Sequence, residues 1–285
     1  MLELATDRRP DGDPAVRLHT LGTILLLHSC IETWFWVLEL ETAVGGVVLL
    51  GAIFTVLLIL GLVPRFRRIA LGLTAGALAV QLIWTFPHIA NHTFLRLFAL
   101  ALLVLADPGS LRERRLVHAA LGWTAAIVLF YTGFQKMLYG TYFRGQYLAY
   151  MVSLTERFSS VFEGLIPVGE LNRLTAIGPP VPGAGPYSVD GMAFLLLANM
   201  VYMVEMGLAA GLLWPRTRRP AIWMTLALIV FIQLGARELF FGMLFCNLVL
   251  VLHPRDVGRR LLPVSVGIYV IALGLKAIGW GGLVT

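Results

Sequence analysis

The chain has 285 residues, of which 58% are hydrophobic and 13% charged, and its formal net charge is +6 at pH 7. Its apolar segments are too long and too numerous for the core of one soluble domain, so the composition indicates a polytopic membrane protein. The positive charge does not indicate nucleic-acid binding, because the basic residues fall in short clusters between the apolar segments.

Nine apolar segments predict membrane-spanning helices. We therefore expect an all-α fold, a polytopic transmembrane helical bundle with eight or nine spans. No break in composition marks a separate soluble part, so residues 1–285 are predicted to form a single domain. The predicted segments are residues 18–40, 44–63, 69–87, 93–107, 116–138, 190–214, 220–235, 239–253 and 262–281.

Five basic clusters predict the orientation of the chain. If the chain crosses at every segment, all five lie on one side of the membrane, and cytoplasmic loops are the ones enriched in Lys and Arg. We therefore expect an integral protein of the cell membrane, of the bacterial inner-membrane type, with a cytoplasmic amino terminus. The clusters are Arg8, Arg9 and Arg17; Arg65, Arg67 and Arg68; Arg112, Arg114 and Arg115; Arg216, Arg218 and Arg219; and Arg255, Arg259 and Arg260.

The stretch from Ala221 to Leu252 would otherwise be taken as one long helix. A single crossing there would move the last basic cluster to the other side, so we expect two short crossings or a re-entrant pair near 220–253. The break is predicted at Arg237 and Glu238, two adjacent charges in apolar surroundings. Interrupted helices survive in a membrane only where protein or a water-filled cavity covers the backbone, which predicts a site nearby.

Two polar groups in the first half of the chain are candidates for function. His28 and Glu32 lie one turn apart on one face of the first span, either as a polar pair that packs helices together or as a pair with a part in catalysis. His88 and His92 flank the start of the fourth span, where His92 has either a structural or a proton-transfer role. No further ligand lies near these two histidines in the sequence, so we expect no metal.

Lys136 ends the fifth span, and the chain has only one other lysine, Lys276, against twenty arginines. An arginine stays protonated, whereas a lysine in an apolar site can lose its proton and act as a base. Proximity to Arg144 would favour that neutral amine. The alternative is a lysine whose charged end reaches from the helix to the lipid headgroups.

The long connection at 140–189 is predicted to lie outside the membrane and to be partly amphipathic. Residues 146–168 mix apolar and charged side chains, which predicts an interfacial amphipathic helix. The Gly-rich and Pro-rich residues 178–188 predict an irregular loop. In the next span, Glu205 is deep enough to need a partner or a proton.

Several short motifs occur in the order found in HTTM proteins, the family formed by the membrane domain of vitamin K-dependent gamma-carboxylase and its bacterial relatives. The resemblance runs from about residue 17 to residue 253. The motifs are Asn91-His92-Thr93-Phe94-Leu95, Gly133-Phe134-Gln135-Lys136-Met137, Tyr142-Phe143-Arg144-Gly145, Glu205 with Pro215-Arg216-Thr217-Arg218-Arg219, and Leu239-Phe240-Phe241-Gly242-Met243-Leu244-Phe245.

The resemblance implies that Lys136 deprotonates a vitamin K hydroquinone-like reduced quinone, with His92 as its partner. Oxygen then converts the quinol to its epoxide, and this drives removal of a proton from a carbon atom, to which carbon dioxide adds. At the cofactor we expect Asn91, Tyr131, Gln135, Arg237 and Glu238. Around the rest of the pocket we expect His28, Glu32, Arg144 and Glu205.

Three departures from the family pattern bear on the substrate. Glu238 stands where the carboxylase has histidine, and one extra residue separates Lys136 from Arg144. Only about thirty residues follow His253, too few for the soluble part that binds the protein substrate of the animal enzyme.

We therefore expect a membrane enzyme that acts on a small or lipidic substrate towards the outer face, by carboxylation or oxygenation. Its partners are expected to be membrane lipid and that substrate. The alternative is a non-enzymatic transporter or a lipid- or quinone-binding protein.

Overall fold

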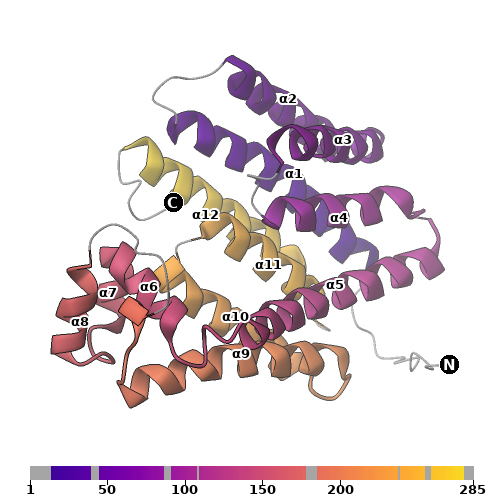
Figure 1. Cartoon of the computed structure of the whole chain (residues 1–285). Coiled ribbons are helices and arrows are strands. Elements are labelled where there is room, and N and C mark those ends of the chain that lie inside the picture. Colours follow the sequence, from indigo (N-terminus) through magenta and orange to yellow (C-terminus); the bar gives the residue numbers. More distant parts are fainter. Residues whose placement is uncertain are drawn as a thin grey trace. The chain divides into compact units, whose positions relative to one another are not determined.

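The computed structural model describes residues 14–39, 45–86, 91–107, 109–177, 185–236, 238–253 and 258–278. Within these ranges the chain forms twelve α-helices, joined by loops and one short 3-10 turn (Figure 1). Each of the nine apolar segments predicted from the sequence coincides with one of these helices. The prediction of an all-α fold is confirmed.

Six of the helices in the described residues are long and apolar enough to cross a membrane. The protein is therefore an integral membrane protein. The six are α1 (Pro14–Glu39), α2 (Gly45–Leu62), α3 (Arg67–Thr85), α5 (Leu111–Leu138), α9 (Met192–Leu213) and α12 (Gly258–Ala277). Two shorter apolar helices are α4 (Asn91–Leu105) and α11 (Leu239–Val251).

The chain divides into two compact units, and each is described by itself. The first comprises residues 1–121 and 243–285. In this unit α1 packs against α2 on one side and α12 on the other, as Figure 1 shows. The side chains of Leu21, Ile24 and Leu25 are completely buried, because α1 is covered on several faces. A polar residue on such a helix must find its partner inside the protein.

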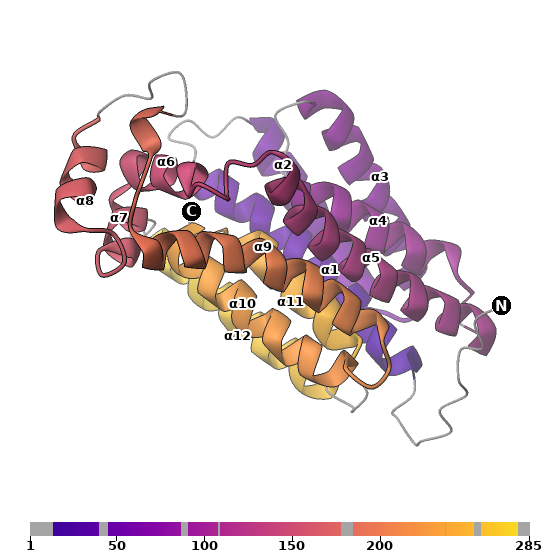
Figure 2. The ribbon, with the colours of Figure 1, turned by 60° about the horizontal axis from the view of Figure 1, so that its bottom comes forward.

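The second unit comprises residues 122–242 and contains three short helices at the start of α9 (Figure 2). They are α6 (Gln146–Leu154), α7 (Glu156–Phe162) and α8 (Val168–Thr175). Their buried apolar side chains, among them Leu148 and Phe162, form one core with Phe194 of α9. Residues 146–175 of the long connection thus form a folded helical cap.

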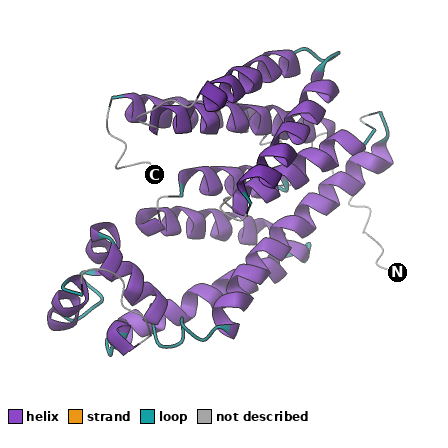
Figure 3. Ribbon diagram, turned by 45° about the horizontal axis from the view of Figure 1, so that its top comes forward, coloured by secondary structure: helices purple, strands orange, loops and turns teal. Residues whose placement is uncertain are grey.

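The prediction of one amphipathic helix over residues 146–168 is wrong. Figure 3 shows that short helices alternate with loops here. The backbone of Thr155 is extended (φ −138°, ψ 130°) and separates α6 from α7. Its hydroxyl accepts a hydrogen bond from the backbone N–H of Phe158 at 3.4 Å, which caps α7. The apolar side chains of Leu148, Val152, Phe162 and Ile166 in this segment are buried within the cap.

The predicted break near 235–238 is confirmed. Helix α10 (Arg218–Ala236) ends at Ala236, and α11 begins at Leu239. The backbone carbonyl of Glu238 accepts a hydrogen bond from the N–H of Gly242 at 2.9 Å, so Glu238 stands at the entry to α11. Arg237 lies outside the described residues.

Replacing Gly145 with alanine is expected to loosen the helical cap. Gly145 has a φ of 65°, and a Cβ there would lie 2.8 Å from Cε1 of Phe194. We expect roughly 1–2 kcal/mol of backbone strain plus about 1–3 kcal/mol of overpacking, measured as a loss in free energy of unfolding in detergent. Gly140→Ala is the matched control, because Gly140 has a φ of 69° but its nearest atom would be 3.9 Å away. Equal losses at both positions would contradict the contact with Phe194.

Candidate functional site

A buried group of polar side chains lies in the first unit, on three helices. We call it the histidine–glutamate cluster; its members are His28 and Glu32 of α1, His92 and Arg96 of α4, and Tyr269 of α12. Each of the pairs on α1 and α4 is spaced by four residues, which puts both members on one face of their helix. The polar faces of α1 and α4 therefore meet.

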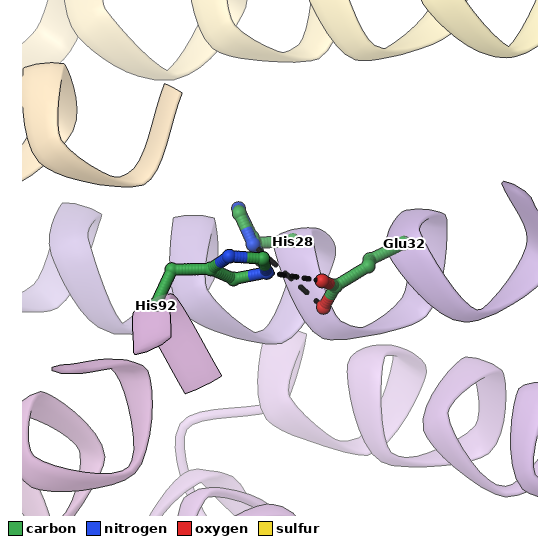
Figure 4. A group of neighbouring side chains, drawn as sticks. All are labelled: His28, Glu32 and His92. Atoms are coloured by element: carbon green, nitrogen blue, oxygen red, sulfur yellow. Dashed lines mark hydrogen bonds and ion pairs between the residues drawn. The ribbon is translucent and has the colours of Figure 1, made fainter. Parts of the chain in front are cut away.

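The carboxylate of Glu32 is the centre of the cluster. Its Oε1 atom lies 2.6 Å from Nε2 of His92, and its Oε2 atom forms an ion pair with Nη1 of Arg96. Nε2 of His28 lies 3.9 Å from the same Oε2 atom. Figure 4 shows His92 reaching from the start of α4 towards the carboxylate, with His28 on the same helix as Glu32.

A second layer of contacts orients His28. Its Nδ1 atom and the hydroxyl of Tyr269 are 2.5 Å apart, and the two rings meet edge to face with centroids 5.6 Å apart. The rings of His28 and His92 are also edge to face, at 6.3 Å. Both imidazoles therefore have fixed orientations relative to the carboxylate.

Charge balance explains why Arg96 belongs to this cluster. Its side chain is only 2% exposed, and Glu32 is also buried. An isolated charge is too costly to bury, whereas a hydrogen-bonded pair of opposite charges is tolerated. The guanidinium of Arg96 thus keeps Glu32 as a carboxylate that accepts a hydrogen bond on each of its two oxygens.

A separate ion pair lies in the second unit, between Nζ of Lys136 on α5 and Oε1 of Glu205 on α9. Glu205 is buried, and the side chain of Lys136 is 18% exposed. Oε2 of Glu205 has no hydrogen-bond partner among the residues that the structure describes. The expectation that Glu205 needs a partner or a proton is confirmed, and the partner is Lys136.

Tyr142 forms one wall beside this pair. Nζ of Lys136 lies 5.3 Å from the centroid of the Tyr142 ring, within the range of a cation–π contact. Burial raises the pKa of the Tyr142 phenol, and the nearby Tyr147 phenol and Glu205 carboxylate raise it further. Tyr142 therefore keeps its hydroxyl proton at neutral pH.

The structure brings together two groups of the predicted residues and leaves others apart. His28, Glu32 and His92 meet in the first unit, and Lys136 and Glu205 meet in the second. The side chains of Asn91 and Arg237 lie outside those described. The remaining predicted residues are exposed, with Tyr131 at 58%; they are Tyr131, Gln135, Arg144 and Glu238.

Arg96 and Tyr269 belong to the cluster but were not predicted from the sequence as site residues. The signal for Arg96 was present, because it is a charge inside an apolar helix, four residues after His92. Tyr269 carried no such signal, since an aromatic residue in an apolar span is ordinary. Its contact with His28 depends on how α12 packs against α1.

Replacing Gly133 with alanine is expected to disturb the Lys136–Glu205 pair. A Cβ there would lie 2.7 Å from the backbone oxygen of Tyr202 and 3.2 Å from Cβ of Glu205. We expect a loss of about 1–3 kcal/mol in free energy of unfolding, because backbone must move to make room. In Gly207→Ala, a matched change on α9 with no atom within 4 Å, we expect a gain of about 0.5–1 kcal/mol. If the free energy of unfolding increased in both Gly133→Ala and Gly207→Ala, that result would contradict the close approach of α5 and α9.

Comparison of the chain with protein-family models, with curated proteins and with solved structures finds no match.

Proposed function

We propose that the protein is a membrane enzyme that uses a reduced quinone and oxygen, with the Lys136–Glu205 pair as the base that takes the quinol proton. The observation that carries the proposal is an amino group at the end of a membrane-spanning helix, held by a buried carboxylate of another such helix. Ionisable residues inside membrane spans mark functional sites by default. The ordered motifs that resemble the HTTM family support the same assignment.

The pairing suggests how a lysine can serve as a base here. Lys136 and Glu205 share one proton, which sits either on the amine or on the carboxylate. In a medium of low polarity the uncharged arrangement, amine with carboxylic acid, competes with the ion pair because separated charges lose their hydration. The free amine then accepts the quinol proton, which leaves an ammonium group beside the carboxylic acid.

The surroundings of Lys136 fit a quinol. The side chain of Lys136 is partly exposed, and the Tyr142 ring lies beside its Nζ atom as an aromatic surface. A bound quinol would react with oxygen to give the quinone epoxide and water, a reaction that drives proton removal from a carbon atom of the substrate. Tyr142 would pack against the quinol and keep water from the amine.

His92 has a different place in this proposal from the one that the resemblance implies. Its hydrogen bond goes to Glu32 in the first unit, and the amino group of Lys136 already has Glu205 in the second. We therefore assign the proton transfer to Lys136 and Glu205. The substrate is small or lipidic, and analysis of the product decides whether carbon dioxide adds to it.

We further propose eight or nine spans in a bacterial inner membrane, with a cytoplasmic amino terminus and Lys136 towards the outer face. The one-sided basic clusters support this orientation. Helices α4 and α11 have 15 and 13 residues, fewer than the roughly 20 that a full crossing needs. They would cross only under cover of neighbouring helices, or form part of a re-entrant pair.

Purified protein tests the enzymatic proposal directly. We expect a quinone in the organic extract of the protein, oxygen uptake on addition of a naphthohydroquinone, and quinone epoxide as a product by mass spectrometry. Heat-inactivated protein corrects for spontaneous oxidation of the quinol. Proton-coupled uptake of a solute into vesicles, with oxygen uptake no faster than in this control, would refute the enzyme and support a transporter.

A further inference from the structure

We propose that His28, Glu32 and His92 bind a divalent transition-metal ion in the first unit. The ligand atoms would be one carboxylate oxygen and the Nε2 atoms of both imidazoles. One ligand atom from each residue lies within 4.8 Å of the others, and all three residues are buried or nearly so. This site goes beyond the proposed quinol chemistry, because Lys136 and Glu205 belong to the other unit.

The distances in the cluster fit an ion after small side-chain rotations. Zinc binds imidazole nitrogen and carboxylate oxygen at about 2.0–2.2 Å, so neighbouring ligand atoms of a tetrahedral site lie roughly 3.3–3.5 Å apart. Nε2 of His92 is now 2.6 Å from Oε1 of Glu32, and one ligand atom from each of the three residues lies within 4.8 Å of the others. The contact between His92 and Glu32 has to open by about 1 Å, and no other pair of ligand atoms has to close by more than about 1.5 Å.

The outer contacts of the cluster are those that metal ligands make. A coordinating histidine typically donates its other N–H to an oxygen, and a coordinating carboxylate accepts a further hydrogen bond. When Nδ1 of His28 donates to the hydroxyl of Tyr269, the lone pair of this imidazole is on Nε2, facing the carboxylate. Arg96 orients the carboxylate in the same way, through Oε2.

The proton on the hydrogen bond between His92 and Glu32 is what the ion would replace. Because Glu32 is paired with Arg96, it is the acceptor, and Nε2 of His92 carries the hydrogen. An ion at Nε2 needs the tautomer of His92 with its hydrogen on Nδ1, so this hydrogen moves from Nε2 to Nδ1 and the neutral ring keeps one N–H. Protons compete with the ion for the imidazole nitrogens and the carboxylate, so the affinity for the ion is expected to fall as the pH falls.

The charge of the site predicts a fourth ligand from outside the chain. With Arg96 beside it, a dication would leave the buried cluster with an excess of positive charge, which hydroxide or an anionic ligand would offset. Nε of Arg96 is buried without a hydrogen-bond partner in the described part of the chain, so it is a donor available to such an anion. Three protein ligands and one open position are typical of catalytic rather than structural zinc sites.

The ligand set also selects the class of ion. Two imidazoles and one carboxylate suit zinc, iron and similar transition metals, whereas magnesium and calcium prefer oxygen ligands alone. The sequence predicts no metal here, because no further ligand lies near His88 and His92 along the chain. The fold supplies two more ligands from α1, about sixty residues away in sequence.

Metal analysis of the intact protein tests the proposal. The full chain, carrying a purification tag without histidine, is stripped with a chelator in detergent and then loaded with Co²⁺ or Zn²⁺. We expect about one ion per chain by mass spectrometry, a visible Co²⁺ spectrum of nitrogen and oxygen ligands, and its loss on competition by Zn²⁺. A stripped and reloaded protein that binds neither ion would overturn the site, and the cluster would then be a purely structural network.

Three variants locate the ion. His92→Ala removes a ligand and is expected to abolish stoichiometric binding, whereas His118→Ala, at a partly buried histidine of α5 outside the cluster, leaves it intact. Tyr269→Phe keeps every ligand and the shape of α12, and is expected to weaken the affinity for Co²⁺ about 10–100-fold. If both His92→Ala and Tyr269→Phe bound Co²⁺ with the affinity of the unmodified chain, the proposed ligands would be wrong. Quinol-dependent oxygen uptake is a separate readout, so failure of one proposal leaves the other standing.

Discussion

The Lys136→Arg variant is expected to remain folded in the membrane and to lose quinol-dependent oxygen uptake by at least about 100-fold. Arginine preserves the positive charge and the ion pair with Glu205, so the contact between α5 and α9 survives. It cannot release its proton, however, and therefore cannot serve as the base. The measurements are oxygen uptake with an oxygen electrode and gel filtration of the detergent-solubilised protein.

The chain supplies its own control for this substitution. Lys276 is the only other lysine, and its Nζ atom lies 4.7 Å from the centroid of the Phe35 ring. An arginine packs on an aromatic ring as well as a lysine does, so Lys276→Arg is expected to keep both fold and activity. A Lys136→Arg protein that consumes oxygen at the rate of the unmodified chain would remove Lys136 from the reaction.

The Arg96→Met variant is expected to lose about 3–5 kcal/mol in free energy of unfolding. Methionine roughly preserves the volume of the side chain, but it leaves the Glu32 carboxylate buried with no guanidinium beside it. The loss is measured by titration with a denaturing detergent. Arg112→Met, on the exposed start of α5, is the control and is expected to change the stability by less than about 0.5 kcal/mol.

A second substitution separates loss of the ion pair from loss of packing. Adding Glu32→Gln to Arg96→Met removes the stranded charge and keeps a group that accepts a hydrogen bond from His92. We expect the double variant to be more stable than Arg96→Met alone, because the coupling energy of two residues in contact typically reaches about 0.5–3 kcal/mol. If the losses in free energy of unfolding of the two single variants simply added in the double variant, Arg96 would act through packing and not through Glu32.

Much of the fold was predictable because the signals for helices in a membrane are local. Every predicted apolar segment matches a helix, and the break before α11 falls where Arg237 and Glu238 interrupt the apolar run. The prediction of one helix over residues 146–168 was wrong because composition does not show where a helix is interrupted. The mixed composition fits one continuous helix as well as several short ones, and only the extended backbone at Thr155 and the core formed with Phe194 exclude the continuous helix.

The candidate site was predictable in part. The four-residue spacing of His28 and Glu32 placed them on one face, and the depth of Glu205 required a partner. The partners themselves were not predictable: Arg96 and Tyr269 went unnoticed, and the hydrogen bond between His92 and Glu32 was not expected. Spacing along one helix is fixed by its 3.6-residue period, whereas pairing between helices depends on their packing.

The sequence by itself determined that this protein is helical, where its helices run and that it belongs in a membrane, because each of these follows from hydrophobicity summed over neighbouring residues. Only the tertiary structure decided which polar groups pair: Glu32 with Arg96 and His92, and Lys136 with Glu205. A charge removed from water must find its opposite wherever the packed helices bring one within reach, and that distance is not written in the spacing along the chain.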